Sequence, residues 1–435
     1  MNQLSFSNLL HKCLPFLYLA FFLSIFCGFR VMSSTCEGTI LGFTLLFALL
    51  DRGHFIKKSK TNYFVAGCLI FYFLQLIALF YTNDKAIGMV QIQVKVTLLI
   101  IPISLYYCDY LNSSFRDRIM PFYVLLLALV LLFCFGAATL KYSVSHDSSV
   151  FFYHALVAPF GHHAIQFSIF VFIGFVYLLE RLRKLSFIIN RSFHFFIISY
   201  YIFFIILLDS KMVIIFSFIS ILIYIGLSIK KTGFFRGRLI LFAILSISIL
   251  FTLVVTHNPV SDRFKDLSNG VNVIEKNQFN PGDYFNGIQF RLLQWKIVKE
   301  ILNENNAWIA GVGPGDAQHL LNNKYRALNM YVGDQQRRSH GYLGYNTHNE
   351  FLESTLQNGI IGLVVFLVIC AGFIQMMINR HNIEFWLIGI LILCYCFLES
   401  VFQTQYGVLL FTFFPLFLFY THQEVIAGES SDPHS

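Results

Sequence analysis

Twelve mostly apolar stretches alternate with shorter polar segments along the chain. Because a helix of about 20 apolar residues crosses the hydrocarbon core of a bilayer, the pattern predicts an all-α integral membrane protein with about 12 transmembrane helices. The expected spans are residues 14–33, 37–51, 63–82, 88–108, 121–140, 162–179, 193–209, 211–229, 239–256, 355–377, 384–400 and 405–421.

One long polar segment, residues 257–354, separates the ninth and tenth expected spans. It predicts a division into a bundle of spans 1–9 (residues 1–256), a large loop, spans 10–12 (residues 355–421) and a polar tail (residues 422–435). No convincing signal-peptidase site follows the first span, so we expect it to remain as an anchor.

Basic residues indicate the orientation, because they concentrate in cytoplasmic loops. They gather in alternate short loops: Arg52, Lys57, Lys58, Lys60, Arg116, Arg118, Arg181, Arg183, Lys184, Arg191, Lys230, Lys231, Arg236, Arg238 and Arg380. This predicts cytoplasmic termini and a large loop outside the cytoplasm. A site on that loop has no cytosolic ATP, so its substrate must arrive already activated.

Composition agrees with a membrane protein. Of 435 residues, 57% are hydrophobic and 12% charged, whereas soluble domains carry about 25% charged residues. The net charge of +8 follows from the loops above, so we expect membrane lipid around the protein and no nucleic acid partner. The nine Cys include no CxxC pair, which favours inert buried thiols.

The large loop is predicted to be ordered. Residues 289–304 place apolar side chains at helical spacing, which predicts a helix at the bilayer surface or under the loop's own fold. The sequence GVGPGD at 311–316 lacks the ending of a nucleotide-binding loop, so we expect a tight turn. Residues 322–345 are predicted to be irregular coil.

A capped helix entry explains most of the polar residues before the tenth span. Thr347 or Asn349 can cap the helix, and Glu350 suits its positive N-terminal end. Capping leaves His348 unexplained. Its neighbours therefore decide whether it is structural or functional.

Polar groups gather at the outer ends of the expected spans: His162, His163, Asp209, Ser210, Lys211, Arg291, Glu399, Gln403 and Gln405. Together with His348 they predict a polar site at the outer rim. Lys211 and Arg291 suit a diphosphate carried by a lipid, and His348 suits proton transfer from an acceptor hydroxyl. Lys95, in mid-span, pairs with a carboxylate across the bundle or faces a substrate cavity.

Four motifs follow in order around the large loop: R-x-x-x-W at 291–295, G-V-G-P-G at 311–315, H-N-x-F-L at 348–352 and N-G-I-I-G-L at 358–363. With the many spans, this order resembles the bacterial superfamily of O-antigen ligases and O-antigen polymerases. The motifs lie within roughly residues 200 to 365, and the earlier spans agree only in number and character.

The resemblance implies transfer of a glycan from undecaprenyl diphosphate, on the periplasmic face of the inner membrane. The acceptor is a lipid A core sugar in ligases and another lipid-linked repeat unit in polymerases. Neither cofactor nor metal is implied. The pair His162–His163 lacks carboxylate or Cys neighbours at ligand spacing.

The motifs carry roles onto individual residues. His348 falls on the family's loop histidine, the base or acceptor-orienting group, and Arg291 on the arginine that binds diphosphate. Lys211 departs from the family's Ser-Arg, because it keeps the charge without the bidentate fork. Supporting roles are expected for Ser210, Asn349, Glu350, His162 and His163. The candidates to substitute for the missing arginine are Arg263, Arg337 and Arg338.

Several functions remain in competition. The long, late loop favours a ligase over a polymerase of O-antigen or exopolysaccharide, although both use the same donor. Twelve spans also suit a polysaccharide transporter or flippase, but the two halves show no convincing repeat. A membrane hydrolase is disfavoured because HExxH and GxSxG are absent from the sequence.

Overall fold

The computed structural model describes residues 3–50, 62–106, 111–184, 189–231, 273–283, 285–334 and 340–421. Every regular element in these ranges is a helix. The helices are α1 (Gln3–Phe26), α2 (Arg30–Leu50), α3 (Tyr63–Ala78), α4 (Lys85–Lys95), α5 (Thr97–Tyr106), α6 (Ser113–Ser145), η1 (Ser148–Phe151), α7 (Tyr153–Val157), η2 (Ala158–Phe160), α8 (Ala164–Lys184), α9 (Ile189–Leu207), α10 (Lys211–Lys231), α13 (Gly287–Glu304), α14 (Ala317–Ala327), α15 (Glu350–Arg380), α16 (Ile383–Leu398), η5 (Val401–Gln403) and α17 (Gln405–Thr421).

Four helical stretches in the described ranges are long and apolar enough to cross a membrane: Lys85–Tyr106, Ser113–Ser145, Ala164–Lys184 and Glu350–Arg380. Shorter apolar helices accompany them: Lys12–Phe26, Tyr63–Ala78, Ser192–Leu207, Lys211–Leu227, Ile383–Leu398 and Gln405–Thr421. The all-helical class is therefore confirmed, and the lengths and apolar composition of these helices are consistent with a membrane protein. The total of twelve spans stays a prediction, because the expected span 239–256 lies outside the described residues. The candidate cations Arg263, Arg337 and Arg338 also lie outside them.

Two expected spans are interrupted in the structure. The span expected at 14–33 is interrupted at Gly28, whose φ of +71° turns the chain between α1 and α2. A Cβ on Gly28 would lie 2.3 Å from the carbonyl oxygen of Phe160. The span expected at 88–108 divides into α4 and α5 around Val96. Hydropathy averaged over the length of a span misses both breaks because apolar stretches lie on each side of them.

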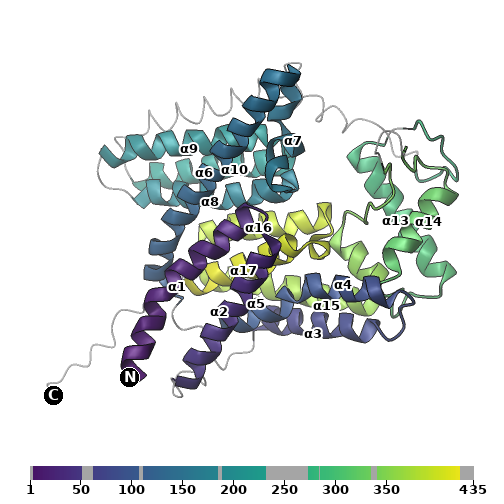
Figure 1. The fold of residues 1–435 in the computed structure, drawn as a ribbon, viewed down its shortest axis with the longest axis horizontal. Helices are drawn as coiled ribbons and strands as arrows, with labels where there is room; N and C mark the ends of the chain where they lie inside the picture. Colours follow the sequence, from purple (N-terminus) through teal and green to yellow (C-terminus); the bar gives the residue numbers. More distant parts are fainter. Residues whose placement is uncertain are drawn as a thin grey trace.

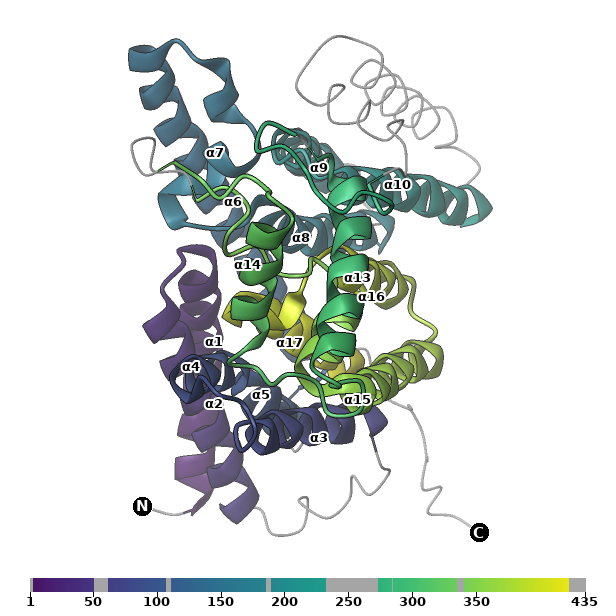
Figure 2. The ribbon, with the colours of Figure 1, turned by 90° about the vertical axis from the view of Figure 1, so that its right-hand side faces the viewer.

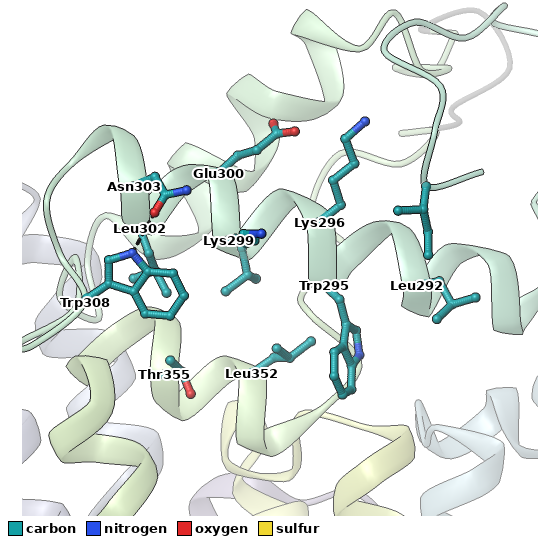
Figure 3. A pocket seen from close by; sticks show the side chains of 12 residues that line it. Leu292, Trp295, Lys296, Lys299, Glu300, Leu302, Asn303, Trp308, Leu352 and Thr355 are labelled. Atoms are coloured by element: carbon teal, nitrogen blue, oxygen red, sulfur yellow. Dashed lines mark hydrogen bonds between the residues drawn. The ribbon is translucent and has the colours of Figure 1, made fainter. Parts of the chain in front are cut away.

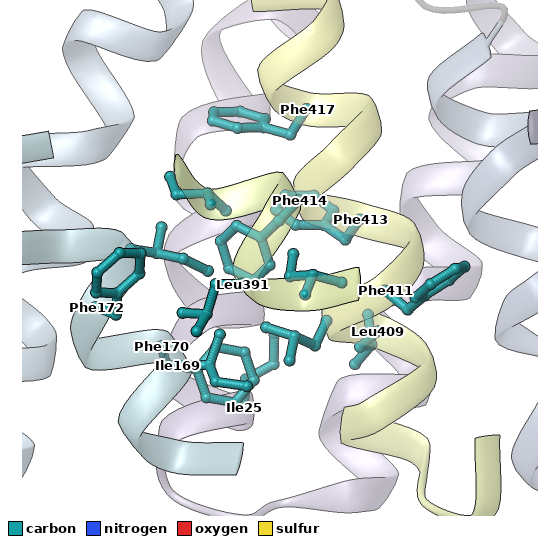
Figure 4. Close-up of a cluster of buried hydrophobic side chains, with 14 of the residues drawn as sticks. Ile25, Ile169, Phe170, Phe172, Leu391, Leu409, Phe411, Phe413, Phe414 and Phe417 are labelled. Atoms are coloured by element: carbon teal, nitrogen blue, oxygen red, sulfur yellow. The ribbon is translucent and has the colours of Figure 1, made fainter. Parts of the chain in front are cut away.

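The last helix, α17, runs through the centre of the bundle and is buried along nearly its whole length. Figure 4 shows its phenylalanines among apolar side chains of α1, α8 and α16. The ring of Phe413 lies edge-on to Phe21 of α1 at 5.1 Å between centroids. A helix that is apolar on all sides is stable only when buried, so α17 fixes the positions of its neighbours.

The described part of the long polar segment packs on one end of this bundle; it is called the outer segment because the sequence predicts it to lie outside the cytoplasm. Figure 1 shows α13 and α14 gathered at that end, and Figure 2 shows them in front of α15, α16 and α17. Leu293 and Ile297 of α13 are fully buried with Leu321 and Tyr325 of α14. The predicted helix at 289–304 is confirmed, and it packs within the fold of the loop.

The coil expected at residues 322–345 is wrong for its first six residues, which belong to α14. The segment AQHLLNNKYRA is polar overall, so hydropathy gave no indication of a helix. The apolar side chains that hold it are Leu321 and Tyr325, four residues apart on one face. Burial of this narrow stripe against α13 accounts for the helix.

Helix α15 is broken at Asn358–Gly359, where Gly359 has φ +63° and ψ −158°. The break frees backbone groups that the loop before α14 satisfies. The N–H of Val312 donates to the carbonyl of Leu356 at 2.8 Å, and the N–H of Ile360 donates to the carbonyl of Trp308, also at 2.8 Å. The Gly-rich turn is thus seated in the broken helix, and its tight-turn interpretation is confirmed.

The other side of the Gly-rich turn is held by the loop between α3 and α4. The carboxylate of Asp316 accepts hydrogen bonds from the N–H of Asn83 at 2.8 Å and from the N–H of Asp84 at 3.0 Å. The hydroxyl of Thr82 accepts from the N–H of Gly315 at 3.2 Å. The outer segment is therefore fixed to two separate parts of the bundle.

We predict that Gly359→Ala lowers the thermal unfolding midpoint of the purified protein. The backbone of Gly359 occupies a region that only glycine adopts readily, which costs another residue about 1–3 kcal/mol. The added Cβ would also lie 2.2 Å from the carbonyl oxygen of Ile309. Gly136→Ala in α6 is the control, because no atom lies within 4 Å of its added Cβ. Equal midpoints for the two variants would contradict this account of the break.

Candidate functional site

His348 is presented by a turn at the start of α15. Asn349 caps the helix, since its side chain accepts a hydrogen bond from the N–H of Leu352 at 3.0 Å. The backbone of His348 adopts the left-handed conformation, with φ +45°. Its ring packs near Phe290 of α13 and Tyr345, with centroids 5.8 and 5.4 Å away. The cap and the aromatic contacts together fix the direction of the imidazole.

The imidazole meets a carboxylate at the end of another helix. Glu399 follows α16, and its Oε2 lies 2.9 Å from Nδ1 of His348. Burial raises the pKa of Glu399, but the hydrogen bond from His348 and the charges of His348, His163 and Arg291 bring that pKa below its usual value. Glu399 is therefore ionised at neutral pH. An ionised partner keeps the proton on Nδ1 of His348 and leaves Nε2 to accept one.

Arg291 lies against the same carboxylate. Its Nη2 is 3.9 Å from Oε1 of Glu399. Its Nε and Nη2 donate to the carbonyl of Leu398 at 3.3 and 2.8 Å, and Nη1 donates to the carbonyl of Gly287 at 2.9 Å. Burial lowers the pKa of Arg291 and the charge of Glu399 opposes this. A guanidinium has five N–H groups, so two remain for an anion on a side chain that is 27% exposed.

The other predicted site residues are distributed around this pair. His163 acts electrostatically on Glu399 and lies 4.5 Å from the ring of His154. His162 faces α1 instead, where its Nε2 bonds to the carbonyl oxygen of Phe26 at 3.0 Å. Burial lowers the pKa of His162 to about 4. Its contacts are those of a packing residue in neutral form.

Lys211 begins α10 and is half-buried, directly after the buried Ser210. Helix α10 packs against α16, which ends at the site. The geometry joins His348 and Arg291 through Glu399, while the role of Lys211 stays a prediction. Asn349 and Glu350 face the protein interior, where Asn349 caps the helix and Glu350 accepts from the N–H of Phe402 at 2.8 Å.

A groove of about 630 Å³ lies between α13 and the first half of α15. Figure 3 shows Trp295 pointing from α13 toward α15, with Leu352 and Thr355 opposite. The groove is lined by Ile274, Leu292, Trp295, Lys296, Val298, Lys299, Glu300, Leu302, Asn303, Trp308, Leu352 and Thr355. Trp295 follows Arg291 by one helical turn, so the groove begins beside the cation of the site.

Sequence reasoning placed Glu399 at the outer rim but gave it no role. The sequence shows Glu399 only as a polar residue at the end of an apolar span, and other rim residues occupy similar positions. The buried Glu353 also stands among the polar residues at the start of the tenth expected span, and the sequence gave it no role. Over the part of the chain that the structure describes, no group of three or more His, Cys, Asp or Glu side chains is arranged to hold a metal ion.

Comparison with known proteins adds one finding. A family model described as O-antigen ligase matches residues 195–367, from α9 through α13 to the first half of α15. No curated protein matches the chain. The matched range contains Lys211, Arg291 and His348. It indicates an integral membrane protein with glycosyltransferase activity of the O-antigen ligase or polymerase type. Residues 195–367, which make up less than half of the chain, are therefore similar to O-antigen ligases.

Proposed function

We propose that the protein is an O-antigen ligase that moves a glycan from undecaprenyl diphosphate to a lipid A core sugar. The reaction takes place on the periplasmic face of the bacterial inner membrane and needs no ATP or metal. Both termini of the protein lie in the cytoplasm in this proposal. One observation carries the proposal: His348 and Arg291, from separate segments, meet on the carboxylate of Glu399. A proton acceptor and an anion-binding cation therefore stand side by side.

The chemistry follows from this arrangement. Nε2 of His348 takes the proton of the acceptor hydroxyl as its oxygen attacks the anomeric carbon of the donor sugar. The bond from that carbon to the phosphate oxygen breaks, and its electron pair leaves with the lipid diphosphate. The free N–H groups of Arg291 and the ammonium of Lys211 stabilise the leaving charge. Glu399 stabilises the imidazolium that forms.

The groove supports a lipid-linked donor. Its lining is largely apolar, with Trp295 and Trp308 partly exposed, and it starts one turn from Arg291. A diphosphate held by Arg291 can therefore extend its isoprenoid chain along α13 toward the bilayer. Trp side chains suit this position because they are enriched where membrane meets water.

Polymerases use the same donor, so the acceptor distinguishes the two activities. We predict that deleting the gene leaves lipid A without polymer while long glycan chains accumulate on the lipid carrier. Extraction and electrophoresis of both lipid pools measure this. Single repeat units on lipid A would assign the polymerase activity instead.

We predict that His348→Ala lowers the transfer rate by about 10²–10⁴-fold, the usual contribution of a general base. The rate is measured with purified protein, an undecaprenyl diphosphate-linked glycan and a lipid A core acceptor. His319→Ala is the control, because His319 is exposed on α14. Full activity of His348→Ala at normal abundance would remove the base assignment.

Lys211 tests the diphosphate assignment. Lys211→Arg keeps the cation and adds the bidentate fork, so we predict that it retains transfer. Lys211→Met removes the charge and is expected to raise the KM for the donor. Titration of donor at saturating acceptor measures both variants. An unchanged KM in Lys211→Met would exclude contact between Lys211 and the diphosphate.

A further inference from the structure

A buried lysine lies among polar side chains behind the site. Lys95, at the end of α4, is 1% exposed. Its Nζ donates to Oε1 of Gln357 on α15 at 2.6 Å and to Oε1 of Gln75 on α3 at 3.0 Å. Burying an ammonium group inside a membrane bundle costs free energy, so a residue that does this is a candidate for a functional role. Neither the proposed base nor the proposed diphosphate contacts accounts for it.

Gln357 also bonds to a buried carboxylate. Its Nε2 donates to Oε1 of Glu353 at 2.6 Å, and Nε2 of Gln403 donates to the same oxygen at 3.0 Å. Since an amide accepts through its oxygen and donates through its nitrogen, Gln357 is oriented by both neighbours. The lysine and the carboxylate are thereby joined through one side chain.

The second oxygen of Glu353 holds the two turns that carry the site. Thr347, next to His348, places its N–H 3.3 Å and its Oγ1 2.9 Å from Oε2. Ser400, next to Glu399, places its Oγ 3.0 Å from Oγ1 of Thr347 and 3.5 Å from Oε2. One carboxylate therefore sets the distance between the neighbours of both catalytic partners.

Charge makes Lys95 the critical member of this network. Glu350 and Glu353 are both buried on the first turn of α15, and both act electrostatically on Lys95. A buried carboxylate that loses a nearby cation is strongly destabilised, because little water is available to take the place of that cation. Without the cation, the hydrogen bonds that Glu353 makes to the turns would rearrange.

We propose that Lys95 is a positioning residue for the His348–Glu399 pair and acts through Gln357 and Glu353. The inference rests on the proposed function, because it concerns the alignment of the proposed base. It predicts that the cation is needed for turnover and not for donor binding, since neither Lys95 nor Glu353 lines the groove beside Arg291.

The test compares Lys95→Met with Lys85→Met, an exposed lysine at the other end of α4. We expect kcat of Lys95→Met to fall by about 100-fold, as for a misplacement of roughly 1 Å, with KM for the lipid-linked glycan unchanged. Lys85→Met should match the wild type. A wild-type kcat in Lys95→Met, or a loss confined to KM, would overturn the inference.

The charge-neutral pair provides the second readout. Glu353→Gln alone removes one of the two acidic residues that act on Lys95 and should also lower kcat. The double variant Lys95→Met with Glu353→Gln removes the charges of Lys95 and Glu353 together, so we expect it to recover at least about tenfold over Lys95→Met. Such coupling is the signature of two interacting residues. Losses that multiply without recovery would overturn the charge pairing.

Two further comparisons keep the outcomes separate. If Lys95→Met does not accumulate in the membrane, Lys95→Gln retains hydrogen bonding without the charge and takes its place in the same assay. An active wild type with inactive His348→Ala and fully active Lys95 variants contradicts only the positioning role. A wild type that transfers no glycan under any donor contradicts the proposed function itself.

Discussion

A carboxylate withdrawn from water must obtain its hydrogen bonds from the protein. Glu353 obtains them from Thr347 in the turn before α15, from Gln357 one turn further along α15, and from Gln403 after α16. The turn before α15 and the turn after α16 are far apart in sequence, and this carboxylate is where they are held together. The geometry of His348 and Glu399 therefore depends on Glu353, which acts through their sequence neighbours Thr347 and Ser400.

The Gly-rich turn shows the same dependence at the level of the backbone. A helix that stops and restarts leaves N–H and C=O groups unsatisfied, and inside a membrane protein water does not satisfy them cheaply. In α15 these groups bond to Trp308, Val312 and Gly313. Two motifs that are separate in sequence, at 311–315 and 358–363, are thus one structural unit. Their glycines serve close backbone approach, and phosphate binding need not be invoked.

Sequence patterns predicted what depends on local composition. They predicted the all-helical class, the helix at 289–304 and the cap at Asn349, and they proposed His348 and Arg291, which the structure brings to one carboxylate. They did not give the turn at Gly28, because hydropathy is blind to a break between two apolar runs. They also missed α14, whose apolar stripe is too narrow to raise its hydropathy.

The pairing of His348 with Glu399 could not be read from the sequence for a different reason. Several rim residues, among them Gln403 and Gln405, have similar chemistry and similar positions at the ends of spans. Only the tertiary fold decides which of them meets the imidazole. Lys95 is a similar case, since the sequence left open whether it faced a carboxylate or a cavity. Its contacts with Gln75 and Gln357 place it in the interior polar network.

The outer segment is attached to the bundle at two places, and this bears on how such proteins diversify. One attachment is the loop at Thr82–Asp84, and the other is the interruption of α15 at Asn358–Gly359. Recombination that exchanged only the outer segment with that of a relative would separate it from both. A chimera inherits a working specificity only if these two short stretches of the membrane bundle travel with it. The natural unit of exchange is therefore discontinuous in the gene.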